Sequence, residues 1–236
     1  MWRIGLGMLL SSFALADADI PLYLMEVPPY TINRPEQRGM VGDVVLEAMR
    51  RAGLREKLLV EPSPRAMARV QVGTNLLIMP LARIPEREPD YTWIEPVARF
   101  ERAFFSLERK AQSFAEAREH FRRVAVSRGT AGYHILLAQG FDRSQLVEVN
   151  QGITAPRMLL ARRVDAWYNP VLEARALLRQ LNNPALQMGT ELGSTDNYLA
   201  CSKSCDPQLV EKLGTALKQM RDDGSTRRIA KRYATD

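Results

Sequence analysis

Short apolar runs alternate along this chain with longer segments of helical period, and this alternation constrains the fold more than any other feature. Such alternation is the signature of α/β units with parallel strands. The 236 residues allow one large domain or two lobes of roughly 100 residues each. The expected strands cover residues 20–25, 58–61, 76–79, 103–107, 124–127, 146–149, 164–168 and 198–202.

A helix is expected between the first two strands, in the segment GDVVLEAMRRAG. Asp43 is expected to cap its start, and Gly53 to end it. The apolar residues between them recur at helical spacing and share one face. The members of that face are Val44, Val45, Ala48, Met49 and Ala52.

Two further helices are expected at the C-terminal end, over 208–221 and 226–233, joined by the sequence DDGS. Gly224 is expected to end the first of these helices, and Ser225 is expected to cap the start of the second. A separate set of α/β units covers roughly 114–189. The segments 102–107 and 190–197 are therefore expected to carry the chain from one lobe to the other and back.

The N-terminal sequence MWRIGLGMLLSSFALADA is typical of a cleavable secretory signal. It has an early cation at Arg3, a short apolar run, and small residues at Ala14 and Ala16, after which we expect cleavage. A buried first helix is the alternative. The apolar run is too short to span a bilayer, and export predicts a periplasmic location.

The only two cysteines, Cys201 and Cys205, lie in the sequence CSKSC. In an oxidising compartment they can close a five-residue loop, which the loop-entropy estimate values at about 2 kcal/mol. A metal or redox pair is the alternative, but His120 and His134 lie in other, helical segments. We therefore expect a disulfide, no metal site and no cofactor.

The net charge of +6 is mild and does not indicate a nucleic-acid partner. Lys and Arg residues are scattered among acids and form no long basic block. The excess of basic over acidic residues is equally well explained by a cleft that is lined by arginines and binds a small anionic or zwitterionic ligand.

Several short motifs, in their order and spacing, resemble the extracellular solute-binding proteins of family 3, the periplasmic receptors of polar amino-acid ABC transporters. The resemblance covers nearly the whole chain after the signal. Its elements are PPYTIN, GMVGDVVLEAMRRAGL, PRAMARVQVG, RIPERE before YTWIEP, VAVSRGTAGY, RRVDAWY and ALKQMRDDGSTRRIAKRY.

This resemblance implies an α/β, two-lobed periplasmic binding protein fold (type II), with two hinge crossovers between the lobes and a ligand in the cleft. Lobe 1 then covers 17–104 and 194–236, lobe 2 covers 105–193, and the signal covers 1–16. It also implies a monomer that delivers a small solute to an ABC transporter permease.

The expected cleft residues of lobe 1 follow its strands, because ligands of open α/β sheets bind beyond the carboxyl ends of strands. Tyr30, after the two prolines of PPY, offers a ring and a hydroxyl, or simply packs over its loop. By resemblance, Arg87 clamps the ligand carboxylate, Arg83 lies where the family offers contacts, and Arg65 matches another cleft position. The alternative for the arginines is a solvated surface role, with Glu86 and Glu88 as partners for Arg83 and Arg87.

From lobe 2, Gly129 and Thr130 lie at a turn from a strand into a helix. Free backbone N–H groups and the positive end of the helix dipole favour a carboxylate there. Ordinary capping by Thr130 is the alternative, and the two roles are compatible.

The sequence departs from the family where an aspartate usually meets the ligand's ammonium group, five residues after the aspartate of RVDA. Counting from Asp165 gives Pro170. Asn169 and Glu173 are the possible substitutes, and Tyr168 or Trp167 is expected in the cleft wall or in the core.

A rival interpretation is an enzyme on the same scaffold, similar to periplasmic cyclohexadienyl dehydratases. Glu173 would then be the general acid, provided that burial raises its pKa. A ligand-sensing module for a membrane receptor is the third interpretation, and it would share every cleft residue.

Overall fold

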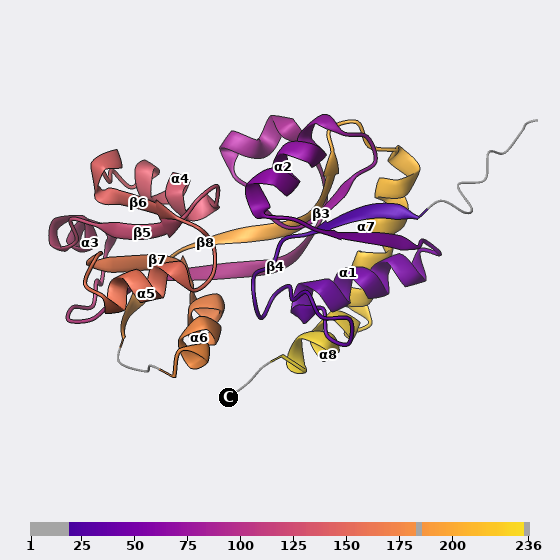
Figure 1. Ribbon diagram of the computed structural model, residues 1–236. Coiled ribbons are helices and arrows are strands. Elements are labelled where there is room, and N and C mark those ends of the chain that lie inside the picture. The colour runs from indigo at the N-terminus through magenta and orange to yellow at the C-terminus, as the bar shows by residue number, and fades with distance from the viewer. Residues whose placement is uncertain (1–18, 183–185, 234–236) are drawn as a thin grey trace, which may run out of the picture.

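The computed structural model describes residues 19–182 and 186–233, so the expected signal lies outside the described residues. One eight-stranded mixed sheet with the order β2-β1-β3-β8-β4-β7-β5-β6 runs through the whole molecule. Helices pack on it at both ends and form two lobes, which lie side by side in Figure 1. The predicted two-lobed α/β fold is therefore confirmed.

Lobe 1 is built on the parallel strands β1 (Ile20–Leu24), β2 (Glu56–Val60) and β3 (Leu77–Ala82). The helices of this lobe are α1 (Gly39–Arg51), α2 (Ser63–Val72), α7 (Pro207–Asp222) and α8 (Ser225–Lys231). Its main core lies between β1, β3, α1 and α7, and it buries residues such as Leu22, Leu77, Met49 and Leu213 completely.

Lobe 2 is built on the parallel strands β5 (Val124–Ser127), β6 (Leu146–Val149) and β7 (Ala166–Pro170). Its helices are α3 (Phe114–His120), α4 (Ala131–Ala138), α5 (Thr154–Leu160) and α6 (Val171–Gln180), and the single turn η2 (Arg143–Gln145) precedes β6. Two apolar clusters on its sheet are centred on the rings of Trp167 and Phe104.

Two 16-residue strands, β4 (Tyr91–Ser106) and β8 (Gln187–Ser202), connect the lobes. They pair antiparallel with each other from Tyr91–Ser202 to Ser106–Gln187, with several register shifts between these ends. The expected lobe boundaries, 104/105 and 193/194, fall inside these strands. The residues at which one lobe passes into the other stay a prediction.

Helix α1 begins one turn earlier than predicted, at Gly39, and Asp43 does not cap it. Its first N–H groups donate instead to loop carbonyls, Met40 N to Pro29 O and Val41 N to Tyr30 O. Its end is as predicted, because Gly53 has φ +68° and Leu54 N donates to Met49 O, the bond of a Schellman motif.

The end of α7 is also as predicted, because Gly224 adopts φ +73° just after it. The prediction that Ser225 caps the next helix was wrong. Gly224 holds the cap position of α8, and Ser225 is the first helical residue. Its hydroxyl accepts hydrogen bonds from Arg51 and Arg228.

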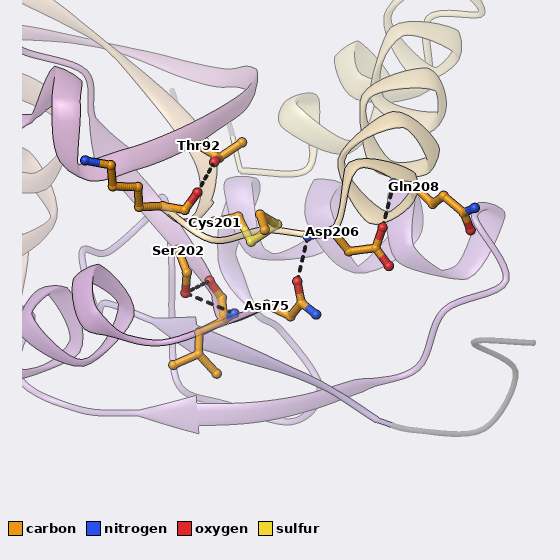
Figure 2. Close-up of a disulfide and its surroundings, with 9 residues drawn as sticks. Asn75, Thr92, Cys201, Ser202, Asp206 and Gln208 are labelled. Carbon is orange, nitrogen blue, oxygen red and sulfur yellow. Dashed lines mark hydrogen bonds between the residues drawn. A yellow bond between two sulfur atoms is a disulfide. The ribbon is translucent and has the colours of Figure 1, made fainter. Parts of the chain in front are cut away.

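Cys201 and Cys205 form the predicted disulfide, at the end of β8 where the chain turns into α7. Figure 2 shows the hydrogen bonds around it. Asp206 N donates to Asn75 Oδ1 at 2.7 Å, and Gln208 N donates to Asp206 Oδ1 at 2.8 Å, which caps α7. The disulfide therefore lies in a segment that is also anchored to the loop before β3.

Candidate functional site

A cavity of about 60 Å³ lies between the two lobes. One buried water needs about 10–15 Å³ of such space, so the cavity corresponds to a few waters or one small molecule. Its walls come from the ends of β3 and β7, the starts of α2, α4 and α6, and the middle of both crossover strands. This is the place where open α/β sheets bind ligands.

Arg87 lies in the 3-10 turn η1 (Pro85–Asp90), which follows β3, and its guanidinium lines the cavity. Nη1 donates to Ala82 O at 3.2 Å, and Nη2 donates across the cleft to Gly129 O at 2.8 Å. Burial lowers the pKa of this guanidinium, and the nearby charge of Arg102 lowers it further. Arg87 is therefore a largely desolvated cation that joins the lobes.

The strand predicted over 76–79 ends too early, because β3 passes through Pro80 and continues to Ala82. Proline has no N–H to donate, and the pairing of β3 with β8 shifts register between Ile78 and Leu81 to pass it. Both Pro80 and Ala82 line the cavity, so the strand carries its backbone to the edge of the site.

On the opposite lobe, Gly129 and Thr130 line the same cavity, at the start of α4. Gly129 has φ +68°, a conformation that favours glycine. The hydroxyl of Thr130 does not cap the helix and donates to Ser127 O at 2.7 Å. Among the described residues, the N–H groups of Ala131 and Gly132 have no acceptor, and both residues line the cavity.

Arg102 lines the cavity although its position in the sequence did not predict it. It lies on β4, its exposure is only 3%, and Nη1 donates to Thr195 Oγ1 at 2.6 Å and to Phe100 O at 3.2 Å. A signal for it existed. Arg102 lies two residues after buried Phe100, so both side chains share one face of a strand, but the strand was predicted to begin only at Ala103.

Glu173 and Asn169 form a buried pair in the cavity wall, where β7 passes into α6. Asn169 Nδ2 donates to Glu173 Oε2 at 2.9 Å, and Glu173 is 4% exposed. Burial raises the pKa of Glu173 to about 7, against the opposing effects of the Asn169 bond and the Arg102 charge. The carboxyl can therefore carry a proton near neutral pH.

Tyr168 and Pro170 also line the cavity. The hydroxyl of Tyr168 donates to Leu192 O at 2.7 Å, and burial raises the pKa of this phenol. Trp167 faces the other side of β7 and packs in the core against Phe105. Pro170 thus occupies the cleft position where the resemblance places an aspartate.

Tyr30, Arg65 and Arg83 do not line the cavity, contrary to expectation. Tyr30 is 2% exposed and stacks on Phe100, with 3.7 Å between ring centroids, so it supports the wall from behind. Arg65 is exposed on α2. Arg83 Nε donates to Glu88 Oε2 at 2.9 Å beside the ring of Trp93, which matches the surface-pair alternative.

Among the described residues, two polar contacts besides the Arg87–Gly129 bond join the lobes around the cavity. The hydroxyl of Ser63 on α2 donates to Gln151 Oε1, which follows β6. His134 Nδ1 on α4 lies 3.6 Å from Glu86 Oε1 on η1.

Apolar contact accompanies these bonds, because Ala82 and Ile84 pack against Ala131. The two lobes thus contact each other around the cavity.

Within the described ranges, no helix is long and apolar enough to cross a membrane. No family model and no curated protein matches the sequence. Solved structures do match.

An ancestral arginine-binding protein bound to arginine superimposes with a TM-score of 0.80 at 17% identity, covering 93% of this chain and 100% of that one. The chain has the fold of the periplasmic amino-acid-binding proteins.

Two other solved structures share this binding-protein fold. A histidine kinase sensor domain with similarity to periplasmic binding proteins gives a TM-score of 0.82 at 15% identity, covering 91% of this chain and 95% of that one. The ancestral amino acid-binding protein AncCDT-1, a precursor of cyclohexadienyl dehydratase, gives a TM-score of 0.75 at 17% identity, covering 91% of this chain and 95% of that one. An arginine-binding protein, a sensor domain and a precursor of an enzyme thus have this architecture.

Proposed function

We propose that this chain is a periplasmic solute-binding receptor of family 3, which captures a small carboxylate-bearing solute by closure of its lobes and delivers it to an ABC importer. One observation carries the proposal. Arg87 from lobe 1 and the open start of α4 from lobe 2 line one cavity, within hydrogen-bonding reach of each other.

The chemistry of these groups favours a carboxylate. A guanidinium presents a planar fork that binds two carboxylate oxygens. The N–H groups of Ala131 and Gly132 supply further donors at the positive end of a helix dipole. A ligand held by both lobes binds the closed state better than the open one, and this difference in affinity is what shifts a hinge equilibrium.

The predicted secretory signal and the Cys201–Cys205 disulfide both support an exported protein. The importer and the monomeric state follow from the resemblance alone. A sensory role would use the same cleft, so the identity of the membrane partner separates the two. Pull-down of the ligand-bound protein with its membrane partner, either a permease or a receptor kinase, distinguishes them.

Thermal-shift screening against amino acids, organic acids and short peptides tests the receptor role, because a ligand that binds the native state raises its melting temperature. Arg87→Ala is expected to abolish the shift, and the control Arg83→Ala to retain it. An unchanged affinity in Arg87→Ala would refute the role assigned to Arg87.

One observation favours a second candidate function, a dehydratase related to the cyclohexadienyl enzymes. Glu173 is a buried acid in the cavity, with a pKa raised to about 7, which suits a general acid. Turnover of prephenate or arogenate that is lost in Glu173→Gln would establish the enzyme. A ligand-induced rise in melting temperature without turnover supports the receptor.

A further inference from the structure

Arg102 is a buried cation that the proposed binding of one carboxylate leaves without a role. Both of its hydrogen bonds come from Nη1 and go to neutral oxygens, those of Phe100 and Thr195. Throughout residues 19–182 and 186–233, no carboxylate lies within 4.0 Å of its guanidinium, and neither Nε nor Nη2 has an acceptor. Part of the fork therefore remains free at the cavity wall.

Burying a guanidinium without a counterion is costly, because a charge removed from water loses its solvation. Burial accordingly lowers the pKa of Arg102, and its charge in turn lowers the pKa of Arg87. Two like charges thus act on each other in one small cavity. An anion placed between them offsets both the desolvation and the repulsion.

Among the described residues that line the cavity, Glu173 is the only acid. Its Oε2 accepts from the Asn169 amide, and its raised pKa leaves it partly protonated near neutral pH. Pro170 stands where the resemblance places the ammonium-binding aspartate. The cavity therefore has two cations and no free carboxylate for a ligand ammonium group.

Part of the cavity wall is apolar, although Ser63, Ser127, Gln151 and Asn197 also line it. Met25, Val27 and Phe100 line it on the side of lobe 1. Such a surface suits a short hydrocarbon skeleton. The volume of about 60 Å³ limits that skeleton to a small molecule.

We propose that the ligand is a small dicarboxylate without an ammonium group, with one carboxylate bound by Arg87 and the start of α4, and the other by Arg102. This inference rests on the proposed receptor function and names its ligand class. The Arg102 contact is the specificity-determining one, because a monocarboxylate would leave that guanidinium unpaired. An amino acid would in addition find no free carboxylate in the cavity wall for its ammonium group.

Three matched sets of probes test the proposal on the full chain by calorimetry. They are the dicarboxylates succinate and glutarate, the monocarboxylates butyrate and valerate of the same lengths, and the amino acids aspartate and glutamate, which add an ammonium group. We expect at least about tenfold tighter binding of a dicarboxylate than of its partners. Equal or tighter binding of the monocarboxylate or the amino acid would overturn the proposal.

Arg102→Met supplies the second readout, because methionine fills much of the volume and removes the charge. We expect the dicarboxylate affinity to fall at least about tenfold and the weak monocarboxylate affinity to stay unchanged. Arg99→Met, at an exposed position on the same strand whose arginine pairs with Glu101 and Asp196, is the matched control. Unchanged dicarboxylate affinity in Arg102→Met would overturn the proposal.

Failure of this inference and failure of the receptor function are distinguishable. Binding of amino acids or monocarboxylates in preference to dicarboxylates rejects the ligand class and keeps the receptor. If the protein binds none of the amino acids, organic acids or peptides, both the ligand class and the receptor function are rejected. Should Arg102→Met not fold, Arg102→Lys replaces it, because it keeps the charge and loses the fork, and its dicarboxylate affinity must still fall.

Discussion

Arg87 Nη2 donates to the carbonyl oxygen of Gly129 at 2.8 Å and so joins a turn of lobe 1 to the strand-to-helix turn of lobe 2. Both partners line the cavity. A ligand carboxylate near this bond would compete with a neutral carbonyl for the guanidinium, and its negative charge makes it the stronger acceptor.

Arg87→Ala is predicted to reduce ligand affinity by far more than it reduces stability. Removing one partner of a buried charged pair costs about 2–5 kcal/mol of binding free energy, or roughly thirtyfold to several thousandfold in Kd. Titration calorimetry with the best ligand from the screen measures the loss. Arg83→Ala is the control, because the Arg83 side chain is 39% exposed and pairs with Glu88. Equal losses in the two variants would contradict the prediction.

Gly129→Ala is predicted to weaken both the fold and ligand binding. A side chain at φ +68° costs about 1 kcal/mol, or about 2–4 °C in melting temperature at this size. The added Cβ would also lie 3.4 Å from Met67 Cε and from Pro64 Cγ on α2, in the opposite lobe. Both distances are at the lower limit of ordinary van der Waals contact, so the methyl group leaves no spare room between the lobes.

Gly53→Ala is the matched control for Gly129→Ala. Gly53 has the same φ of +68°, lies at the end of α1, and has open space where its Cβ would be. We expect a similar loss of melting temperature and unchanged affinity. If Gly129→Ala also leaves affinity unchanged, Gly129 has no part in closure.

Stability is predicted to fall as pH rises from about 4.5 to about 7, because of Glu173. Its pKa is about 7 in the folded protein and about 4.5 in the unfolded chain. Between these values the native state binds more protons than the unfolded state, so deprotonation disfavours folding. Above pH 7 both states are ionised and this contribution no longer changes.

Glu173→Gln is expected to remove this pH dependence and to be more stable than the parent at pH 8. Urea unfolding midpoints at pH 5 and pH 8 provide the measurement. Glu148→Gln, at an exposed position on β6, is the control. A parent and a Glu173→Gln protein with the same pH slope would show that Glu173 stays ionised in the fold.

Reduction of the Cys201–Cys205 disulfide is predicted to lower the free energy of unfolding by about 2 kcal/mol, the loop-entropy value for a short loop. Urea unfolding with and without reductant measures the difference. Cys205→Ser should match the reduced protein and show no further response to reductant. If the reductant still lowered the free energy of unfolding of Cys205→Ser, the effect could not come from this disulfide and the prediction would be wrong.

The regular α/β units could be predicted from sequence because their hydrophobic pattern is local. Strands 124–127 and 146–149 have the predicted bounds, since short runs rich in apolar residues form them; the first is fully buried and the second partly so. The crossover strands were predicted much too short. Polar residues such as Arg99 and Asp196 interrupt their pattern, because the middle of each strand lies between the lobes and not under helices.

The cavity was only partly predictable, because sequence position indicates where a strand ends and not which way the next side chain points. Arg87, Gly129, Thr130, Tyr168 and Asn169 line it as expected. Tyr30 follows its strand as predicted, but its ring turns onto Phe100 in the core. Arg102 was missed, because the strand was predicted to begin one residue later, at Ala103, whereas β4 begins at Tyr91.

The bond between Arg102 on β4 and Thr195 on β8 ties the innermost cation of the cavity to both crossover strands. Any movement of the lobes must bend or twist these same strands. A solute that binds Arg102 would therefore contact the crossover strands directly, and these are the strands that must deform when the lobes move. Substitutions at Thr195 should therefore change the rate of lobe closure as well as the affinity for the ligand.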